Sequence, residues 1–463
     1  MGEFMVVKEL TDKKLFLELD NGKLEDGKEI DLQGWVRTNR NNGSIGFIEF
    51  NDGTYFKNIQ LVYDSSNEEY EKYSHIRYGS TIEVFGIIKL TPTNKQPFEI
   101  TVKKINLLND CAEDYPLQKK RHSFEFLRDI AHLRPRSNTF YAVFRVRNVL
   151  AYAIHKYFQE RNFVYVHTPL ITANDAEGAG QVFKVVADMK HPNDFFKANA
   201  SLTVSGQLHV EAFAMAYKDV YTFGPAFRAE NSNTTRHASE FWMIEPEMAF
   251  CDLEDNMNVI ESFLKYIISY TLENCKEEMK FFDTFIEKGL LDKIHHILNS
   301  EFKRLSYTEA IEILLKAQKD GHKFEFNNIY WGMDLQSEHE RYITEQVFKG
   351  PVFLVDYPKE IKAFYMKLNK DNKTVAACDL LVPSVGELIG GSQREEDYNK
   401  LKAKMDEIGN SKGLEWYLDL RKYGGCIHSG FGLGFDRLLM YITGINNIRD
   451  VQPYPRTPGS LKF

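Results

Sequence analysis

The first hundred residues alternate between apolar and polar positions in short runs, with the period of two that is typical of half-buried β-strands. Gly and Asn residues separate the runs, and five short strands joined by such turns favour a small closed barrel. The pattern does not specify the type of barrel, and a short helix near Lys8 to Leu19 precedes it. The predicted strands are Ile30 to Arg37, Ile45 to Phe50, Tyr55 to Tyr63, Thr81 to Leu90 and Phe98 to Leu107.

Residues 111–136 differ in composition and are predicted to be a hinge between two domains. A basic cluster, Gln118 to His122, lies within it and is either solvated or in contact with phosphates. From Ser137 or Asn138 onward, apolar residues follow helical spacing as far as Asn162. The strand Phe163 to Leu170 comes next, and strands and helices then interleave, which predicts an α+β domain over residues 137–463.

Further elements of this second domain follow from the same patterns. A helix is expected over His209 to Lys218 and another over Asp252 to Glu273. Ser306 and Glu309 form a capping box at the start of a helix over Ala310 to Gln318. Strands are expected over Val352 to Val355, Ala363 to Leu368 and Val375 to Val382.

The stretch with the most distinctive chemistry is a predicted antiparallel hairpin between Val220 and Glu245. Its arms are aromatic and apolar, and the Asn/Ser/Thr loop at Asn231 to Thr235 is turn chemistry. Arg228, Arg236 and His237 could bind a polyphosphate, while Phe241 offers a flat face for a base. The alternative is a surface hairpin that carries solvated charges.

A second distinctive stretch, Gly430 to Arg437, alternates glycine with other residues and then enters the apolar helix Leu438 to Ile442. It is not the dinucleotide fingerprint Gly-x-Gly-x-x-Gly, and alone it would be weak evidence. Its value comes from its occurrence downstream of the hairpin.

Composition excludes several classes of protein. The 463 residues carry 58 Lys and Arg against 66 Asp and Glu, a formal charge of -8, so RNA contacts would need local basic patches. Five scattered cysteines lack metal spacing and indicate free thiols in a reducing compartment. Neither a membrane-length apolar run nor a signal-peptide pattern is present, and we expect a cytoplasmic protein.

Together the two stretches resemble motifs 2 and 3 of the class II aminoacyl-tRNA synthetases, Arg-x-Glu with Arg-His-x-x-Glu-Phe and Gly-x-Gly-x-Gly-x-x-Arg. The helix and strand that end at Pro169 resemble motif 1, which forms the homodimer interface in that family. The resemblance implies an antiparallel catalytic sheet flanked by helices. It also implies that the barrel, residues 1–110 with the short helix, is an OB-fold that binds the anticodon.

Roles for individual residues follow from the resemblance. Arg228 and Arg437 are the expected catalytic residues, on the α-phosphate and the outer phosphates of ATP. Glu387 is the better expected Mg²⁺ ligand and Asp379 the weaker, because their separation is one residue longer than in aspartyl enzymes. The expected ATP-binding residues are Arg228, Glu230, Arg236, His237, Phe241, Glu387 and Arg437.

The amino acid and the tRNA also have expected contacts. Glu177 and Gln207 are expected at the ammonium group, with Ser205 in the same segment. Glu245 would accept from a substrate amide and Arg394 would donate to it, unless Glu245 is a structural acid bonded to backbone. Phe47, Gln60 and Glu99 are expected to contact the anticodon, although Phe47 could instead belong to the barrel core.

Within the family the chain most resembles the bacterial asparaginyl enzymes. The implied substrates are asparagine, ATP with Mg²⁺, and tRNA(Asn), joined through an asparaginyl-adenylate. An aspartyl enzyme is the first alternative, but Val210 stands where aspartyl enzymes place a lysine. A tRNA-independent asparagine synthetase would not need the barrel, and a non-catalytic RNA-binding relative would lack ATP residues that are present here.

Overall fold

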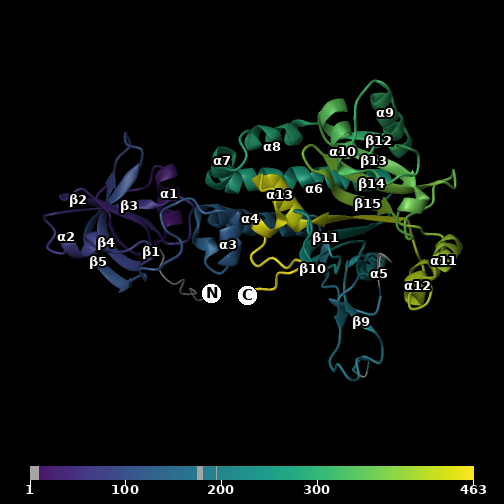
Figure 1. The fold of residues 1–463 in the computed structure, drawn as a ribbon, viewed down its shortest axis with the longest axis horizontal. Helices are drawn as coiled ribbons and strands as arrows, with labels where there is room; N and C mark the ends of the chain where they lie inside the picture. Colours follow the sequence, from purple (N-terminus) through teal and green to yellow (C-terminus); the bar gives the residue numbers. More distant parts are fainter. Residues whose placement is uncertain (1–9, 175–180, 194) are drawn as a thin grey trace. The chain divides into compact units, whose positions relative to one another are not determined.

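The computed structural model describes residues 10–174, 181–193 and 195–463, which form two compact units. The first unit ends at Ser137 and the second runs from Asn138 to Phe463. Figure 1 shows the fold of each unit. None of the described helices is long and apolar enough to cross a membrane.

The first unit is a closed five-stranded barrel with the strand order β1-β2-β3-β5-β4, which confirms the predicted OB-type barrel. Its interior is a single apolar cluster that includes Val36, Ile48, Phe50 and Leu61. The elements are α1 (Asp12–Asp20), β1 (Glu29–Asn41), β2 (Ile45–Asn51), β3 (Ile59–Asp64), α2 (Tyr70–Ser74), β4 (Thr81–Leu90) and β5 (Phe98–Asn109), followed by α3 (Phe124–Asp129) and a short 3-10 turn, η1 (Arg134–Arg136).

The third strand starts later than its apolar pattern predicts. Residues 55–58 form a loop, because the Asn51 amide donates to the backbone carbonyls of Tyr55 and Lys57 at 3.0 and 3.1 Å. These side-chain bonds occupy the carbonyls, and the strand begins only at Ile59. Helices α2 and α3 are too short for their periodicity to be visible in the sequence.

The second unit contains an eight-stranded sheet in the order β12-β13-β14-β15-β16-β11-β10-β6. The six central strands are antiparallel, as predicted, whereas each edge strand pairs in parallel with its neighbour. Helix α6 packs on β14, β15 and β16 and against α4 (Figure 1). The strands are β6 (Val164–Tyr165), β10 (Asp219–Phe227), β11 (Glu240–Ala249), β12 (Lys303–Ser306), β13 (Val352–Pro358), β14 (Thr374–Val382), β15 (Gly386–Gln393) and β16 (His428–Gly434).

Helices and short strands surround this sheet. The helices are α4 (Asn138–Gln159), α5 (Gln207–Tyr217), α6 (Leu253–Asn274), α7 (Lys276–Phe285), α8 (Leu290–Asn299), α9 (Tyr307–Lys319), α10 (Ser337–Arg341), α11 (Tyr398–Glu407), α12 (Glu415–Lys422) and α13 (Phe435–Thr443). A π-helical turn, η2 (Tyr342–Val347), continues α10, and short 3-10 turns lie at η3 (Lys359–Ile361) and η4 (Ile448–Asp450). A small sheet contains β7 (Ile171–Thr172), β9 (Ala200–Leu202) and β8 (Lys184–Val185). The predicted capping box of α9 is confirmed by reciprocal bonds between Ser306 and Glu309.

Two predicted strands are wrong. The strand expected over Phe163 to Leu170 pairs with β10 only at Val164 and Tyr165, and the chain then leaves the sheet before Pro169, which cannot donate to a ladder. The strand expected over Ala363 to Leu368 is absent from the described sheet and makes only isolated bridges. Its apolar residues Phe364 and Tyr365 are buried against α11 and α12 instead. The apolar pattern therefore indicated that these residues are buried, not that they form a strand.

Two acids, the buried Asp12 and the half-buried Asp52, join α1 to the barrel and make its stability depend on pH. The backbone N–H of Asp12 donates to the Asp52 carboxyl at 2.8 Å, and the N–H of Asp52 donates to the Asp12 carboxyl at 2.9 Å. Burial and the Asp52 charge raise the pKa of Asp12 to about 8. The folded state therefore retains a proton that the unfolded state loses near pH 4.

We expect the barrel to lose stability as pH rises from about 4 to 8, by up to about 1.4 kcal/mol per pH unit, and to level off above pH 8. The Asp12→Asn variant keeps the shape of the pair without an ionisable group at residue 12. Calorimetry at several pH values should show a higher melting temperature than wild type at pH 9 and a flatter pH profile. Equal pH profiles for the two proteins would contradict this account.

Candidate active site

The predicted hairpin and the glycine-alternating strand are neighbours in the sheet. Strands β10 and β11 pair with Ala226 opposite Phe241, and β11 pairs with β16 with Met243 opposite Gly434. Glycine is needed at 430, because a Cβ there would lie 2.0 Å from a Glu247 carboxylate oxygen. The glycine alternation therefore lets side chains from β11 cross the surface of β16.

One cavity opens over these strands, and its walls contain every residue that the sequence assigned to ATP. Arg228 stacks over the ring of Phe241, with its guanidinium carbon 5.4 Å from the ring centre. Arg437 lies in the first turn of α13, directly after the glycine strand. The cavity is lined by Arg228, Glu230, Arg236, His237, Ala238, Phe241, Met243, Glu387, Leu388, Gly432, Gly434, Asp436, Arg437 and Ile448.

Arg236 of the cavity is bound to the β14–β15 turn. Its guanidinium donates to the backbone carbonyl of Val385 at 2.9 Å, in the turn between β14 and β15. Burial, together with the nearby charges of Arg437 and Arg341, lowers its pKa. Arg236 therefore connects the hairpin loop to the β14–β15 turn as well as lining the cavity.

The two expected metal ligands have different surroundings. Glu387 lines the cavity, whereas Asp379 is 4% exposed and forms an ion pair with Lys362. Loss of water around the carboxyl and the Asp379 charge raise the pKa of Glu387, and Lys362 and Arg437 oppose that shift. Carboxylates of this kind suit Mg²⁺, and Glu387 is the one open to the cavity.

A β-bulge brings the two carboxylates to the same face of the sheet. Leu380 pairs with Ile389, but the next pair is Leu381 with Glu387, so Leu388 is an extra residue in β15. Because side chains alternate between faces, this residue turns Glu387 to the face of Gly390 and Asp379. A Cβ on Gly390 would lie 3.1 Å from Glu387 and 3.4 Å from Asp379.

The residues expected to bind the amino acid surround the start of α5. The Glu245 carboxylate accepts from the Ser205 hydroxyl and from the backbone N–H of Gly206, the latter at 2.9 Å. Gln207 donates to Glu211 at 3.2 Å. Gly206 is required here, since a Cβ would lie 2.5 Å from the Thr168 hydroxyl. Glu177 lies outside the described residues.

Arg394 does not pair with Glu245 but with Glu247, two residues further along β11. Its Nε and one terminal nitrogen each donate to a Glu247 oxygen at 2.9 Å, and the other donates to Ser392 at 2.7 Å. Burial would lower the pKa of Arg394, but the Glu247 carboxylate outweighs it and raises that pKa. The arginine is therefore charged and held in a fixed orientation.

A second buried charge group was missed by the sequence reading. Glu211 accepts from Tyr417, from Arg421 at 3.0 Å and from His428 at 3.1 Å, and its side chain is fully buried. Although burial favours a neutral carboxyl, Arg421 and His428 hold the pKa of Glu211 well below its usual value. A charged residue inside the apolar helix α5 was the available signal.

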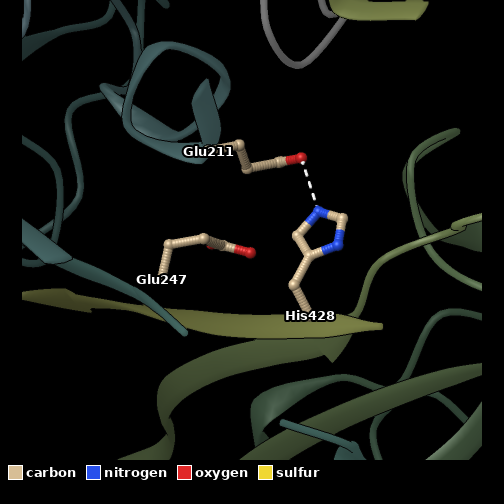
Figure 2. A group of neighbouring side chains, drawn as sticks. All are labelled: Glu211, Glu247 and His428. Carbon is tan, nitrogen blue, oxygen red and sulfur yellow. Dashed lines mark hydrogen bonds and ion pairs between the residues drawn. The ribbon is translucent and has the colours of Figure 1, made fainter. Parts of the chain in front are cut away.

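Glu211, Glu247 and His428 point toward one another in Figure 2, with ligand atoms within 4.8 Å. That spacing would suit a metal ion. The carboxylates, however, are already paired with Arg421 and Arg394, and a divalent cation would be placed beside two guanidinium groups. The charges balance without a metal. The group is a set of fixed charges next to the residues that are expected to bind the amino acid.

The residues expected at the anticodon share one outer face of the barrel. Phe47 is only half-buried and lies outside the core cluster, and Arg40 lies over its ring at 5.3 Å. In the strand register Glu49 is opposite Gln60, and Gln60 is opposite Glu99. The Gln60 amide donates to Glu99 at 3.3 Å. An aromatic ring beside polar groups suits an unpaired base.

Comparison with known protein families identifies the class. Residues 124–458 match the model for "tRNA synthetases class II (D, K and N)", and residues 30–108 match the model for the "OB-fold nucleic acid binding domain". The chain belongs to the class II tRNA synthetases of this group. The predicted family and fold are confirmed.

Within this group of synthetases, the chain is similar to asparaginyl enzymes. The chain is 59% identical over 449 residues to the asparagine–tRNA ligase of Clostridium tetani (strain Massachusetts / E88), covering 94% of this chain and 96% of that protein. It is similar to the crystal structure of asparaginyl-tRNA synthetase from Pyrococcus horikoshii complexed with asparaginyl-adenylate, with a TM-score of 0.86, 35% identity and coverage of 98% and 100%. The structure of the Entamoeba histolytica asparaginyl-tRNA synthetase in complex with asparaginyl-adenylate is similar with a TM-score of 0.82 and 26% identity. The match covers 95% of this chain and 97% of that chain.

Proposed function

We propose that the protein ligates asparagine to tRNA(Asn) at the expense of ATP. The observation that carries the proposal is the single cavity that brings together all seven expected ATP residues, in a chain 55–59% identical to asparagine–tRNA ligases. In the first step the asparagine carboxylate attacks the α-phosphorus and releases pyrophosphate. In the second the terminal ribose hydroxyl of the tRNA attacks the adenylate carbonyl and releases AMP.

Catalysis of the first step needs positioning and charge neutralisation rather than a covalent nucleophile. Phe241 holds the adenine face and Arg228 the α-phosphate, while His237 and Arg437 hold the outer phosphates. Glu230 contacts the adenine or the tRNA end. Glu387, with Asp379 on the same face of the sheet, would hold Mg²⁺, which would supply positive charge against the phosphates.

Asparagine is selected over aspartate by fixed charges. Gln207 would contact the ammonium group, with Ser205 in the same segment, and Glu177, outside the described residues, is expected to contact it too. Glu245 would accept from the side-chain amide. Arg394, held by Glu247, has N–H groups left to donate to the side-chain carbonyl. The charge of Arg394 is already balanced by Glu247, and Glu245 adds a negative charge to the pocket. An aspartate carboxylate would therefore be repelled, because the described part of the pocket offers it no further unpaired cation.

Pyrophosphate exchange into ATP tests this function directly. Purified protein with asparagine should exchange without tRNA, and exchange with aspartate should be slower by at least about a hundredfold, the discrimination expected when a buried polar site is mispaired. Faster exchange with aspartate would identify an aspartyl enzyme. Exchange with asparagine but no transfer to tRNA would favour a tRNA-independent synthetase.

Phe47 tests the anticodon face. Phe47→Ala should raise the KM for tRNA(Asn) roughly five- to 150-fold, which corresponds to about 1 to 3 kcal/mol, because an anticodon base loses the aromatic ring on which it stacks. Pyrophosphate exchange, which needs no tRNA, should not change. Phe47→Tyr is the matched control, since it keeps an aromatic face. If the Ala variant instead melts much earlier and charges tRNA normally, Phe47 has only a structural role.

Homodimerisation through motif 1 is the proposed assembly. Pro169, Leu170 and Ile171 are exposed where the chain leaves the edge strand β6, and Val164 on β6 is 38% exposed. An exposed apolar strip at a sheet edge suits a partner with the same strip. Sedimentation equilibrium should give a dimer, and Ile171→Glu should shift it toward monomer; a monomeric wild type would exclude this assembly.

A further inference from the structure

The turn that carries Glu387 is held by a helical segment distant from it in sequence. This segment, residues 337–347, consists of α10 and the π-helical turn η2, and we call it the clamp segment. The backbone N–H of Glu387 donates to the Glu340 carboxylate at 3.0 Å, and the N–H of Ser384 donates to the Glu345 carboxylate at 2.9 Å. Two acids of the clamp segment thus bind two amides of the β14–β15 turn.

The fit between Glu340 and the turn is close. Gly386 has a φ of +84°, and a Cβ on it would lie 2.3 Å from a Glu340 oxygen. Ser384 also has a positive φ, +70°, so the turn has an unfavourable backbone conformation that its contacts must maintain. Only glycine at 386 leaves room for Glu340 to reach the next amide.

The same turn is also bound from the hairpin loop. Arg236 donates to Val385 at 2.9 Å and approaches the Ser337 hydroxyl at 3.5 Å. The turn is therefore fixed from two sides, by an arginine of the ATP cavity and by acids of the clamp segment. The π-helical turn that follows α10 is a rare form that often marks functional sites.

We propose that Glu340 is a positioning residue: by accepting the Glu387 N–H it fixes the start of β15, and thereby the Glu387 carboxylate, at the place where the divalent cation of ATP binds. This rests on the proposed function, since it assumes that Glu387 is a metal ligand. Glu340 acts through the backbone of Glu387, so its hydrogen-bond acceptor matters more than its charge. Groups behind a metal ligand commonly change metal affinity by about 10- to 100-fold.

The test compares Glu340→Ala with Glu340→Gln. Binding of Mn²⁺ to the protein–ATP complex, without asparagine, is followed by the paramagnetic resonance signal of free Mn²⁺. Glu340→Ala removes the acceptor and should weaken Mn²⁺ binding about tenfold or more. Glu340→Gln keeps an acceptor for the Glu387 N–H and should stay within about threefold of wild type. The Mg²⁺ concentration for half-maximal pyrophosphate exchange should shift in parallel.

Glu338→Ala is the matched control. Glu338 lies on the same helix and accepts backbone N–H groups of Glu325 and Phe326 at 2.9 and 2.7 Å, away from the turn. Its loss should leave Mn²⁺ binding unchanged. Unchanged Mn²⁺ binding in Glu340→Ala would overturn the proposal. Weakening of about tenfold or more in Glu340→Gln would also overturn it, because it would assign the effect to the charge of Glu340. The Gln result is decisive even if the Ala variant does not fold. A wild type without asparagine-dependent exchange would refute the proposed function instead.

Discussion

Arg437→Ala should lower asparagine-dependent pyrophosphate exchange by about two to three orders of magnitude. A fixed cation on the charge that develops on transferring phosphates contributes about 3 to 4 kcal/mol to such a step. Arg437 sits at the cavity wall in the first turn of α13, and its guanidinium makes no hydrogen bond to another described residue. Its removal should therefore leave the fold and tRNA binding largely intact.

The matched control is Arg456→Ala, because Arg456 is also near the C-terminus but its side chain, among the described residues, donates to the backbone of Lys462 and Phe463 and lies outside the cavity lining. Exchange by this control should match wild type. Arg228→Ala should resemble Arg437→Ala, with a loss of the same order. Near-normal exchange in Arg437→Ala, in protein whose melting temperature is unchanged, would remove Arg437 from the phosphate site.

Arg394→Lys is expected to raise the KM for asparagine by about ten- to a hundredfold, with the KM for ATP nearly unchanged. A hydrogen bond from a charged donor contributes about 1.5 to 3 kcal/mol. Lysine keeps the charge beside Glu247, but a single ammonium group cannot reproduce a planar fork that serves Glu247, Ser392 and a substrate carbonyl at once. Exchange kinetics with varied asparagine and varied ATP measure both constants.

Arg145→Lys controls for the loss of an arginine–glutamate pair. Arg145 donates to the buried Glu278 at 2.7 Å, elsewhere in the catalytic unit. This change should lower the melting temperature without altering either KM. If Arg394→Lys behaves in the same way, Arg394 serves the fold and not the substrate.

Most residues of the proposed ATP cavity could be predicted from sequence because they lie in two short motifs. Arg228, Phe241 and Arg437 are each within a few residues of a turn or a glycine strand, so local pattern and resemblance located them. The strands of the barrel were visible for a similar reason, since alternation along one strand is a local property. The largest differences are that β1 continues to Asn41, beyond the predicted end at Arg37, and that β3 starts later than predicted, where the Asn51 side chain holds a loop in place of a ladder.

The amino-acid pocket was harder to predict because its partners are distant in sequence. The sequence predicts Arg394 and Glu245 at the substrate amide, but it does not show that Glu247, on the same face of β11, orients the Arg394 guanidinium. Glu211 and Arg421 are separated by 210 residues, and Glu340 and Glu387 by 47. Burial, not periodicity, decides which acid meets which base, and a sequence without its fold does not show it.

The bulge at Leu388 limits how the β14–β15 hairpin can change in length during evolution. Removing one residue from the start of β15 would restore regular pairing and rotate the Glu387 side chain to the opposite face, away from Asp379. A single-codon deletion there would thus be far more harmful than a conservative substitution. Insertions and deletions at this hairpin should be tolerated only in pairs that restore the facing of both acids.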